Sequence, residues 1–137
     1  MKFLVDTNVV SEIRKGPRCH ESVARWVENT APSDLFISVI TIGEIRRGVE
    51  RIRRRDSRSA DILEAWLFEL VAEYEDRIVP IDLEIATEWG RLNVPDPLPV
   101  VDGLLAATAR VRNLVVATRN VRDIARAGVD TVNPWLP

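Results

Sequence analysis

Four acidic residues stand at comparable points of the chain, where an apolar segment meets a polar one or a helix begins. They are Asp6, Glu44, Asp102 and Asp123. Four carboxylates brought to one place would repel one another unless cations lie among them. Carboxylate oxygens are the ligands that Mg²⁺ and Mn²⁺ prefer, and a chain with one cysteine and one histidine does not offer a zinc site. The acids therefore indicate a hard divalent metal.

Each of these acids, taken alone, also has a structural interpretation. An aspartate where a strand turns into a helix commonly caps that helix, so Asp6 and Asp102 are candidates for an N-cap as well as for a metal site. Glu44 follows Ser38 by six residues and lies among apolar neighbours, where few surface glutamates are found. For Asp6 the metal interpretation is favoured by the three later acids, and Thr7 or Asn8 can then cap the helix.

The elements that must position these acids are short apolar strands separated by helices. The expected strands are Phe3–Val5, Leu35–Ser38, Arg77–Ile81 and Leu114–Ala117, with a last edge strand within Gly128–Val132. Helical periodicity fills the intervals, including a pair of antiparallel helices between residues 39 and 74. This alternation predicts a three-layer α/β/α domain with a short parallel sheet of four to five strands, whose carboxyl ends share one edge. Ligands bind at that edge, so the four acids are expected to converge there.

Length and composition predict one soluble domain spanning residues 1–137. Apolar residues make up 46% of the chain and charged residues 29%. The single cysteine, Cys19, excludes an internal disulfide framework and agrees with a reducing compartment. No signal-peptide pattern and no apolar run of bilayer-spanning length is present. We therefore expect a cytoplasmic protein that does not associate with a membrane.

The positive charge of the chain is concentrated in one segment although the net charge is −2. Seven arginines lie between residues 46 and 58: Arg46, Arg47, Arg51, Arg53, Arg54, Arg55 and Arg58. Guanidinium groups match phosphate oxygens, so this segment is a candidate phosphate-binding face. A solvated helix face, or a surface for an acidic protein, is the alternative, because Glu50 and Asp56 offset part of the charge.

The chain resembles the PIN domain family, and within it the VapC- or FitB-like toxins of bacterial toxin–antitoxin pairs. The resemblance covers the whole chain, and its motifs are specific only in combination. They are Leu4-Val5-Asp6-Thr7-Asn8-Val9-Val10-Ser11-Glu12, Ser38-Val39-Ile40-Thr41-Ile42-Gly43-Glu44-Ile45-Arg46-Arg47-Gly48, Asp102-Gly103-Leu104-Leu105-Ala106-Ala107-Thr108-Ala109, and Ala117-Thr118-Arg119-Asn120-Val121-Arg122-Asp123 with Asn133-Pro134-Trp135.

The resemblance implies an acidic quartet that binds Mg²⁺ or Mn²⁺ and cleaves RNA. These acids fall on Asp6, Glu44, Asp102 and Asp123 of this chain. From the chemistry of such an ion we expect Asp6 and Asp102 to be the main ligands, Glu44 a ligand or general base, and Asp123 a ligand or water-positioning group. Asn120 stands where some relatives carry the fourth acid, so the fourth ligand is Asn120, Asp123 or both. Gly103 departs from the more usual alanine.

Residue chemistry predicts the surroundings of the site, and the resemblance implies its protein partners. Thr7, Thr118 and Asn120 are expected to support the ligands, and Arg46, Arg47, Arg51 and Arg54 to guide the RNA. Toxins of this kind are held by an antitoxin whose basic residue enters the acidic pocket, and they commonly pair as homodimers.

Two other classes of function stay open from the sequence. A Mg²⁺-dependent phosphotransfer or phosphatase domain would need a second aspartate two residues after Asp6 and a suitable lysine, whereas the chain has only Lys2 and Lys15. A non-catalytic PIN-like binding protein would bind metal without cleaving RNA.

Overall fold

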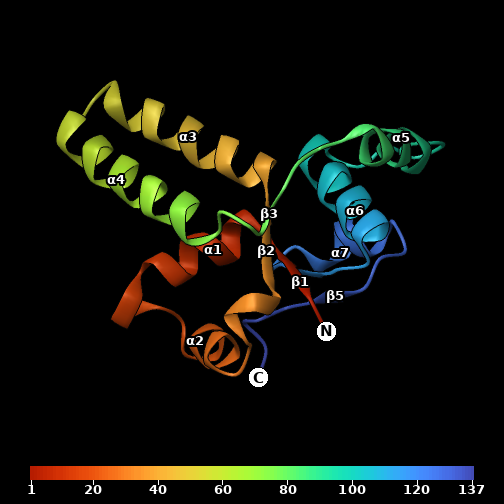
Figure 1. The fold of residues 1–137 in the computed structure, drawn as a ribbon, viewed down its shortest axis with the longest axis horizontal. Coiled ribbons are helices and arrows are strands. Elements are labelled where there is room, and N and C mark those ends of the chain that lie inside the picture. Colours follow the sequence, from red (N-terminus) through yellow and green to blue (C-terminus); the bar gives the residue numbers. More distant parts are fainter.

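The computed structural model describes residues 1–137 and contains one five-stranded parallel sheet between two layers of helices (Figure 1). The strand order is β3-β2-β1-β4-β5. The strands are β1 (Phe3–Val5), β2 (Leu35–Ser38), β3 (Ile78–Val79), β4 (Val115–Ala117) and β5 (Thr131–Val132). This arrangement confirms the predicted fold class.

Seven α-helices connect these strands, and the short helix α7 after the fourth strand was not predicted from the sequence. They are α1 (Thr7–Arg14), α2 (Glu21–Glu28), α3 (Val39–Arg53), α4 (Ser57–Glu73), α5 (Leu83–Leu92), α6 (Val100–Arg112) and α7 (Val121–Ala125). Helices α3 and α4 form the expected antiparallel pair at one end of the molecule (Figure 1). No helix combines the length and the apolar character that crossing a bilayer requires.

The two edge strands are shorter than the sequence predicted. β3 comprises only Ile78 and Val79 of the expected Arg77–Ile81 strand, and β5 only Thr131 and Val132 of the expected Gly128–Val132 segment. Each edge strand has a single neighbour, and Pro80 has no N–H to donate to the ladder, so pairing ends early.

The central strand β1 separates two apolar cores because successive side chains point to opposite faces. Leu4 joins the core under α5, α6 and α7, where Leu105 and Val116 are also buried. Val5 joins the core under α1 and α4, with Ile37 and Leu67. A strand that is apolar on both faces is typical of a sheet covered on both sides, and it fixes β1 at the middle.

The position of β1 decides where a ligand site can form. The chain builds the sheet from β1 outward through β2 to β3 on one side and then returns to add β4 and β5 on the other side of β1, so the strand order reverses at β1. Open parallel sheets bind their ligands in the crevice beyond the strand ends at such a switch point. The residues that follow β1 and β4 therefore lie at the candidate site.

Helix caps distinguish the predicted acids from one another. Asp6 caps α1, Ser38 caps α3 and Asp82 caps α5, each through a side-chain oxygen that accepts a backbone N–H. Helix α6 begins after Pro99 and has no side-chain cap. The alternative interpretation of Asp102 as an N-cap is therefore wrong, whereas the same interpretation of Asp6 is confirmed.

Candidate metal centre

Asp6 lies directly beyond β1 and is buried, with 7% of its surface exposed. Its Oδ1 accepts a hydrogen bond from the Thr7 N–H at 2.7 Å, and its Oδ2 accepts one from the Thr118 hydroxyl at 2.7 Å. The side-chain amide of Asn8 lies 3.4 Å from the same Oδ2. Asp6 thus caps α1 and also faces the end of β4, so the structural and the chemical interpretation hold together.

Burial raises the pKa of Asp6, and the negative charge of Glu44 adds to this rise. The hydrogen bonds from Thr118 and Thr7 act in the opposite direction without cancelling it. The ionised form of this carboxylate is therefore poorly compensated by the protein alone. A cation beside it would supply the missing positive charge.

Glu44 lies in the second turn of α3, and Thr7 connects it to the start of α1. The Thr7 hydroxyl donates to Oε1 of Glu44 at 2.5 Å and lies 3.4 Å from the hydroxyl of the buried Thr41. Oε2 of Glu44 has no hydrogen-bond partner in the chain. One oxygen of this carboxylate is held in place, and the other is free for a ligand or a proton.

Asp102 lies in the first turn of α6, and its carboxylate is repelled by the charges of the other three acids. Burial is the largest cause that raises the pKa of Asp102, followed by the charges of Asp6, Asp123 and Glu44. Asn120 opposes this shift by donating from Nδ2 to Oδ2 of Asp102 at 3.0 Å. The structure therefore brings all four predicted acids into one electrostatic neighbourhood.

Hydrogen bonds from the turn after β4 link Asp6 to Asp102. The Thr118 hydroxyl donates to Asp6 and accepts the backbone N–H of Asn120 at 2.9 Å. Asn120 then donates to Asp102, and Asp123 follows in α7 with Arg126 at 4.0 Å. Asn120 and Asp123 both border Asp102, so the choice of the fourth ligand between them stays a proposal.

The donor set suits a hard cation that keeps part of its hydration shell. No three His, Cys, Asp or Glu side chains form a coordination sphere by themselves, and hydrogen bonds from Thr7 and Asn120 hold Glu44 and Asp102. Mg²⁺ is commonly bound through one or two carboxylates, with water and substrate phosphates completing its sphere. The residues present fit such an ion.

Gly103 directly follows Asp102, and the structure explains why the chain has no side chain here. A Cβ at Gly103 would lie 3.1 Å from Nε1 and 3.2 Å from Cδ1 of Trp89. The Trp89 Nε1 is itself buried without a hydrogen-bond partner. The glycine noted in the sequence thus lies at a close contact between α5 and α6, which periodicity alone did not reveal.

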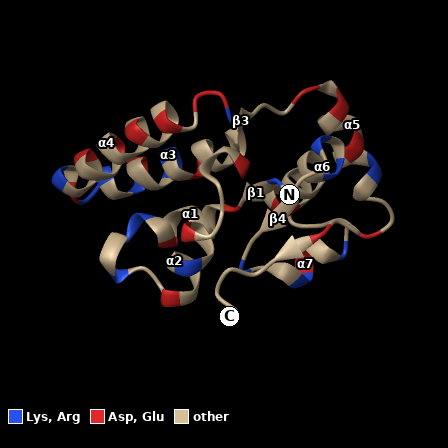
Figure 2. Ribbon diagram, turned by 60° about the horizontal axis from the view of Figure 1, so that its bottom comes forward, with Lys and Arg blue, Asp and Glu red and all other residues tan.

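The arginines between residues 46 and 58 extend from the middle of α3 through the turn to the start of α4 (Figure 2). Arg46 donates to Glu64 at 2.6 Å and to Glu50 at 3.1 Å, and Arg53 donates to Asp61 at 2.8 Å. These two arginines therefore hold α3 against α4. The remaining five make no ion pair: Arg47, Arg51, Arg54, Arg55 and Arg58.

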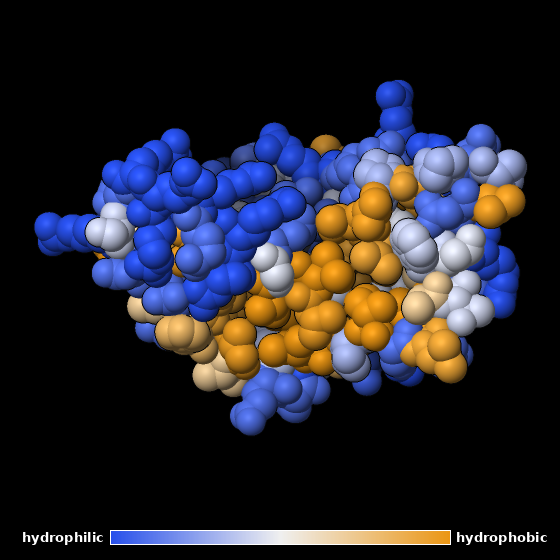
Figure 3. All heavy atoms as spheres, turned by 90° about the horizontal axis from the view of Figure 1, so that it is seen from above, coloured by the Kyte–Doolittle hydropathy of each residue, from blue (hydrophilic) through white to orange (hydrophobic).

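The face seen from above combines two surfaces of different character (Figure 3). The end formed by α3 and α4 is hydrophilic, and the middle of the face is apolar. Val39 at the start of α3 and Val100 at the start of α6 are exposed.

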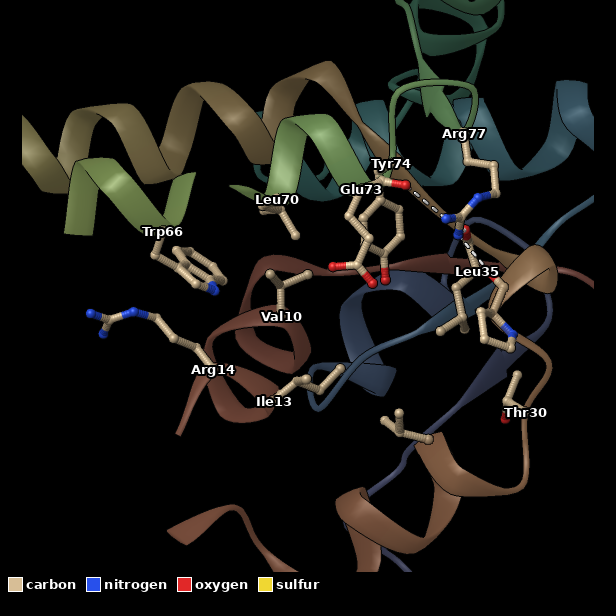
Figure 4. A pocket seen from close by; sticks show the side chains of 12 residues that line it. Val10, Ile13, Arg14, Thr30, Leu35, Trp66, Leu70, Glu73, Tyr74 and Arg77 are labelled. Carbon is tan, nitrogen blue, oxygen red and sulfur yellow. Dashed lines mark hydrogen bonds between the residues drawn. The ribbon is translucent and has the colours of Figure 1, made fainter. Parts of the chain in front are cut away.

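A recess between α1, α2 and α4 lies apart from the acids (Figure 4). It has a volume of about 280 Å³, and none of the four predicted acids lines it. Val10, Leu70 and Tyr74 form part of its wall, and the Arg14 guanidinium lies over the Trp66 ring. This recess was not predicted from the sequence, and it contains none of the proposed metal ligands.

Comparisons with known proteins identify the family of the chain. The PIN domain family matches residues 3–129. The chain is 32% identical to toxin FitB of Neisseria gonorrhoeae over 140 residues, covering 97% of this chain and 98% of that protein. It is 30% identical to the VapC ribonuclease Y4jK of Sinorhizobium fredii over 142 residues, covering 98% and 99%.

One solved structure is similar to this chain in both fold and sequence. The crystal structure of FitAcB from Neisseria gonorrhoeae superposes with a TM-score of 0.89 at 30% identity, covering 98% of this chain and 99% of that one. The family model matches nearly the whole chain, and two relatives are at least 30% identical to it. The parallel-sheet fold that the chain shares with the solved relative points to the same family. The chain belongs to the PIN domain family.

Proposed function

We propose that this protein is a metal-dependent endoribonuclease that acts as the toxin of a toxin–antitoxin pair. The observation that carries the proposal is the convergence of Asp6, Glu44, Asp102 and Asp123 at the carboxyl edge of the sheet, where their charges act on one another. Similarity to a protein named a VapC ribonuclease and to a toxin supports the same reaction and the same biological role.

PIN-domain ribonucleases generally depend on divalent metal ions, and the cation proposed here is Mg²⁺ or Mn²⁺. Asp6 and Asp102 would hold it, with Glu44 and Asp123 as further ligands or as groups acting on water. When bound, such an ion lowers the pKa of water to give a nucleophile near neutral pH and offsets the charge of the phosphodiester.

The residues of the chain prepare the carboxylates for this task. Thr118 and Thr7 fix the two oxygens of Asp6, and Asn120 fixes Asp102, so these acids need little reorganisation. Oε2 of Glu44 is free of hydrogen bonds from the chain and is the acceptor proposed for the proton of the attacking water.

The proposal includes the partners expected from the sequence. The substrate is RNA, and an anionic pocket attracts the basic side chain of a cognate antitoxin by charge complementarity. We also propose that the protein pairs into homodimers and acts in the cytoplasm. Residues 1–137 would form one domain. The single cysteine supports a reducing compartment.

The variant Asp6→Asn tests the function. Asparagine keeps an oxygen for the Thr7 N–H and a group that can bond the Thr118 hydroxyl, so the fold should survive. A bound metal is worth several kcal/mol of transition-state stabilisation, so RNA cleavage with Mg²⁺ should fall by about 100-fold or more. Gel assays of labelled RNA and arrest of cell growth on expression measure the two effects.

Two outcomes would contradict the proposal. Unchanged cleavage by a folded Asp6→Asn protein would show that the reaction takes place elsewhere. Metal binding by the unaltered protein without cleavage of any cellular RNA would indicate a binding protein instead. Sequencing the cleaved ends of cellular RNA after brief expression identifies the substrate and supplies the RNA for the assay.

A further inference from the structure

The ion pairs of α3 leave a defined set of arginines available for a ligand. Arg46 and Arg53 are engaged by Glu50, Asp61 and Glu64, so their charges are compensated within the α3–α4 pair. Arg47 and Arg51 are exposed and make no ion pair. Arg47 and Arg51 are therefore better candidates than Arg46 for guiding RNA.

The unpaired arginines continue the face of α3 that begins at Glu44. Arg47, Arg51 and Arg54 follow Glu44 at intervals of three, four and three residues, and such intervals place residues on one side of a helix. At a rise of about 1.5 Å per residue, Arg47 and Arg51 lie about 4.5 and 10.5 Å beyond Glu44 along the helix axis. The positive charges therefore start next to the acids and lead away from them.

Gly48 keeps the surface beside this row open. It lies one turn after Glu44, and a Cβ added there would meet no atom within 4 Å. A glycine inside a helix costs about 1 kcal/mol relative to alanine, and no contact within the chain requires one here. The helix backbone next to Glu44 is consequently accessible to a ligand that approaches closely.

We propose that α3 binds the backbone of single-stranded RNA on one side of the cleaved bond, with Arg47 and Arg51 contacting successive phosphates. The inference rests on the proposed function, because it takes the acids as the place of cleavage. Guanidinium groups bind phosphate oxygens in a bidentate way, which fixes the strand as well as attracting it. Arg54 extends the same row toward the end of α3.

The test compares two double variants in the Asp6→Asn background. Arg47→Ala/Arg51→Ala removes two charges from the proposed row, and Arg55→Ala/Arg58→Ala removes two unpaired charges from the neighbouring turn and the start of α4. All four side chains are exposed, so both proteins should fold. The probe is a fluorescein-labelled single-stranded RNA of mixed sequence, and fluorescence anisotropy gives the affinity over a series of KCl concentrations.

The slope of the logarithm of affinity against the logarithm of salt concentration reports the number of phosphate contacts. Each contact to a single strand contributes about 0.7 to this slope, so Arg47→Ala/Arg51→Ala should reduce its magnitude by about 1.4. The control variant should leave the slope unchanged. An equal loss in both variants, or an unchanged slope in the first, would overturn the proposal, and the second result would favour an acidic protein as the partner.

Failure of this inference is distinguishable from failure of the proposed function. If the Asp6→Asn parent cleaves the probe on a denaturing gel as fast as the unaltered protein does, the catalytic assignment is wrong. If the probe stays intact and the slope of the Arg47→Ala/Arg51→Ala variant does not change, only the path of the RNA is wrong.

Discussion

Thr118 is the residue on which the arrangement of the acids depends most directly. Its hydroxyl donates to Asp6 and accepts the N–H of Asn120, although Thr118 and Asp6 are separated by 112 positions in the chain. Thr118 is fully buried, so water cannot replace either bond. A buried polar group that loses its partner costs about 1–3 kcal/mol.

Thr118→Val should therefore lower the free energy of unfolding by about 1–3 kcal/mol, because valine has the same shape and no hydroxyl. Cleavage should fall as well, since Asp6 and the turn carrying Asn120 are no longer joined. Urea denaturation measures the first effect and RNA cleavage the second. Thr118→Ser keeps the hydroxyl and serves as the control, and equal losses in the two variants would show that the hydroxyl is not what matters.

At the scale of elements, the contact between α5 and α6 positions Asp102. Trp89 from α5 lies against Gly103 of α6, which follows Asp102 directly. Helix α6 has no side-chain cap, so packing and not capping determines where its first turn lies. The location of one acid therefore depends on an aromatic residue that takes no part in the chemistry.

Gly103→Ala tests this dependence, with Gly90→Ala as the matched control. Both glycines are in helices, but a Cβ at Gly90 meets nothing within 4 Å, whereas one at Gly103 comes within 3.1 Å of the indole. Gly90→Ala should gain about 1 kcal/mol of stability in urea denaturation. Gly103→Ala should gain nothing and should lower cleavage, and an equal gain in both would refute the role of Trp89.

At the scale of the whole molecule, the sheet brings together acids whose mutual repulsion destabilises the folded state. Asp6 and Asp102 both have raised pKa values because burial and neighbouring carboxylates disfavour their ionised forms. A cation that binds only the folded protein relieves this repulsion and stabilises the fold by mass action. The metal should therefore be visible in thermal unfolding without any measurement of activity.

Mg²⁺ or Mn²⁺ should raise the melting temperature of the unaltered protein, with a stabilisation of about 2.7 kcal/mol at 100 times the dissociation constant. Asp102→Asn should lose most of this stabilisation because it removes a proposed ligand. Glu28→Gln, which removes one exposed charge from the end of α2, should retain it. If the metal stabilises all three proteins equally, it binds outside the acidic site.

The sequence by itself determined the order of strands and helices and the four acids. Apolar runs and helical periodicity are local patterns, and parallel strands linked by helices must end at one edge, so the fold class and the neighbourhood of Asp6, Glu44, Asp102 and Asp123 followed without coordinates. The lengths of the edge strands did not follow, because they depend on whether a neighbouring strand is present to pair with.

Only the tertiary structure decided how these residues are supported and which arginines remain free. The bond from Thr118 to Asp6, the pairing of Arg46 with Glu64 and the contact of Gly103 with Trp89 join segments that are distant in the chain. Local periodicity contains no information about such contacts, since each depends on the packing of two elements against each other. For the same reason the sequence left Asp102 open as a cap, and the packing of α6 excluded it.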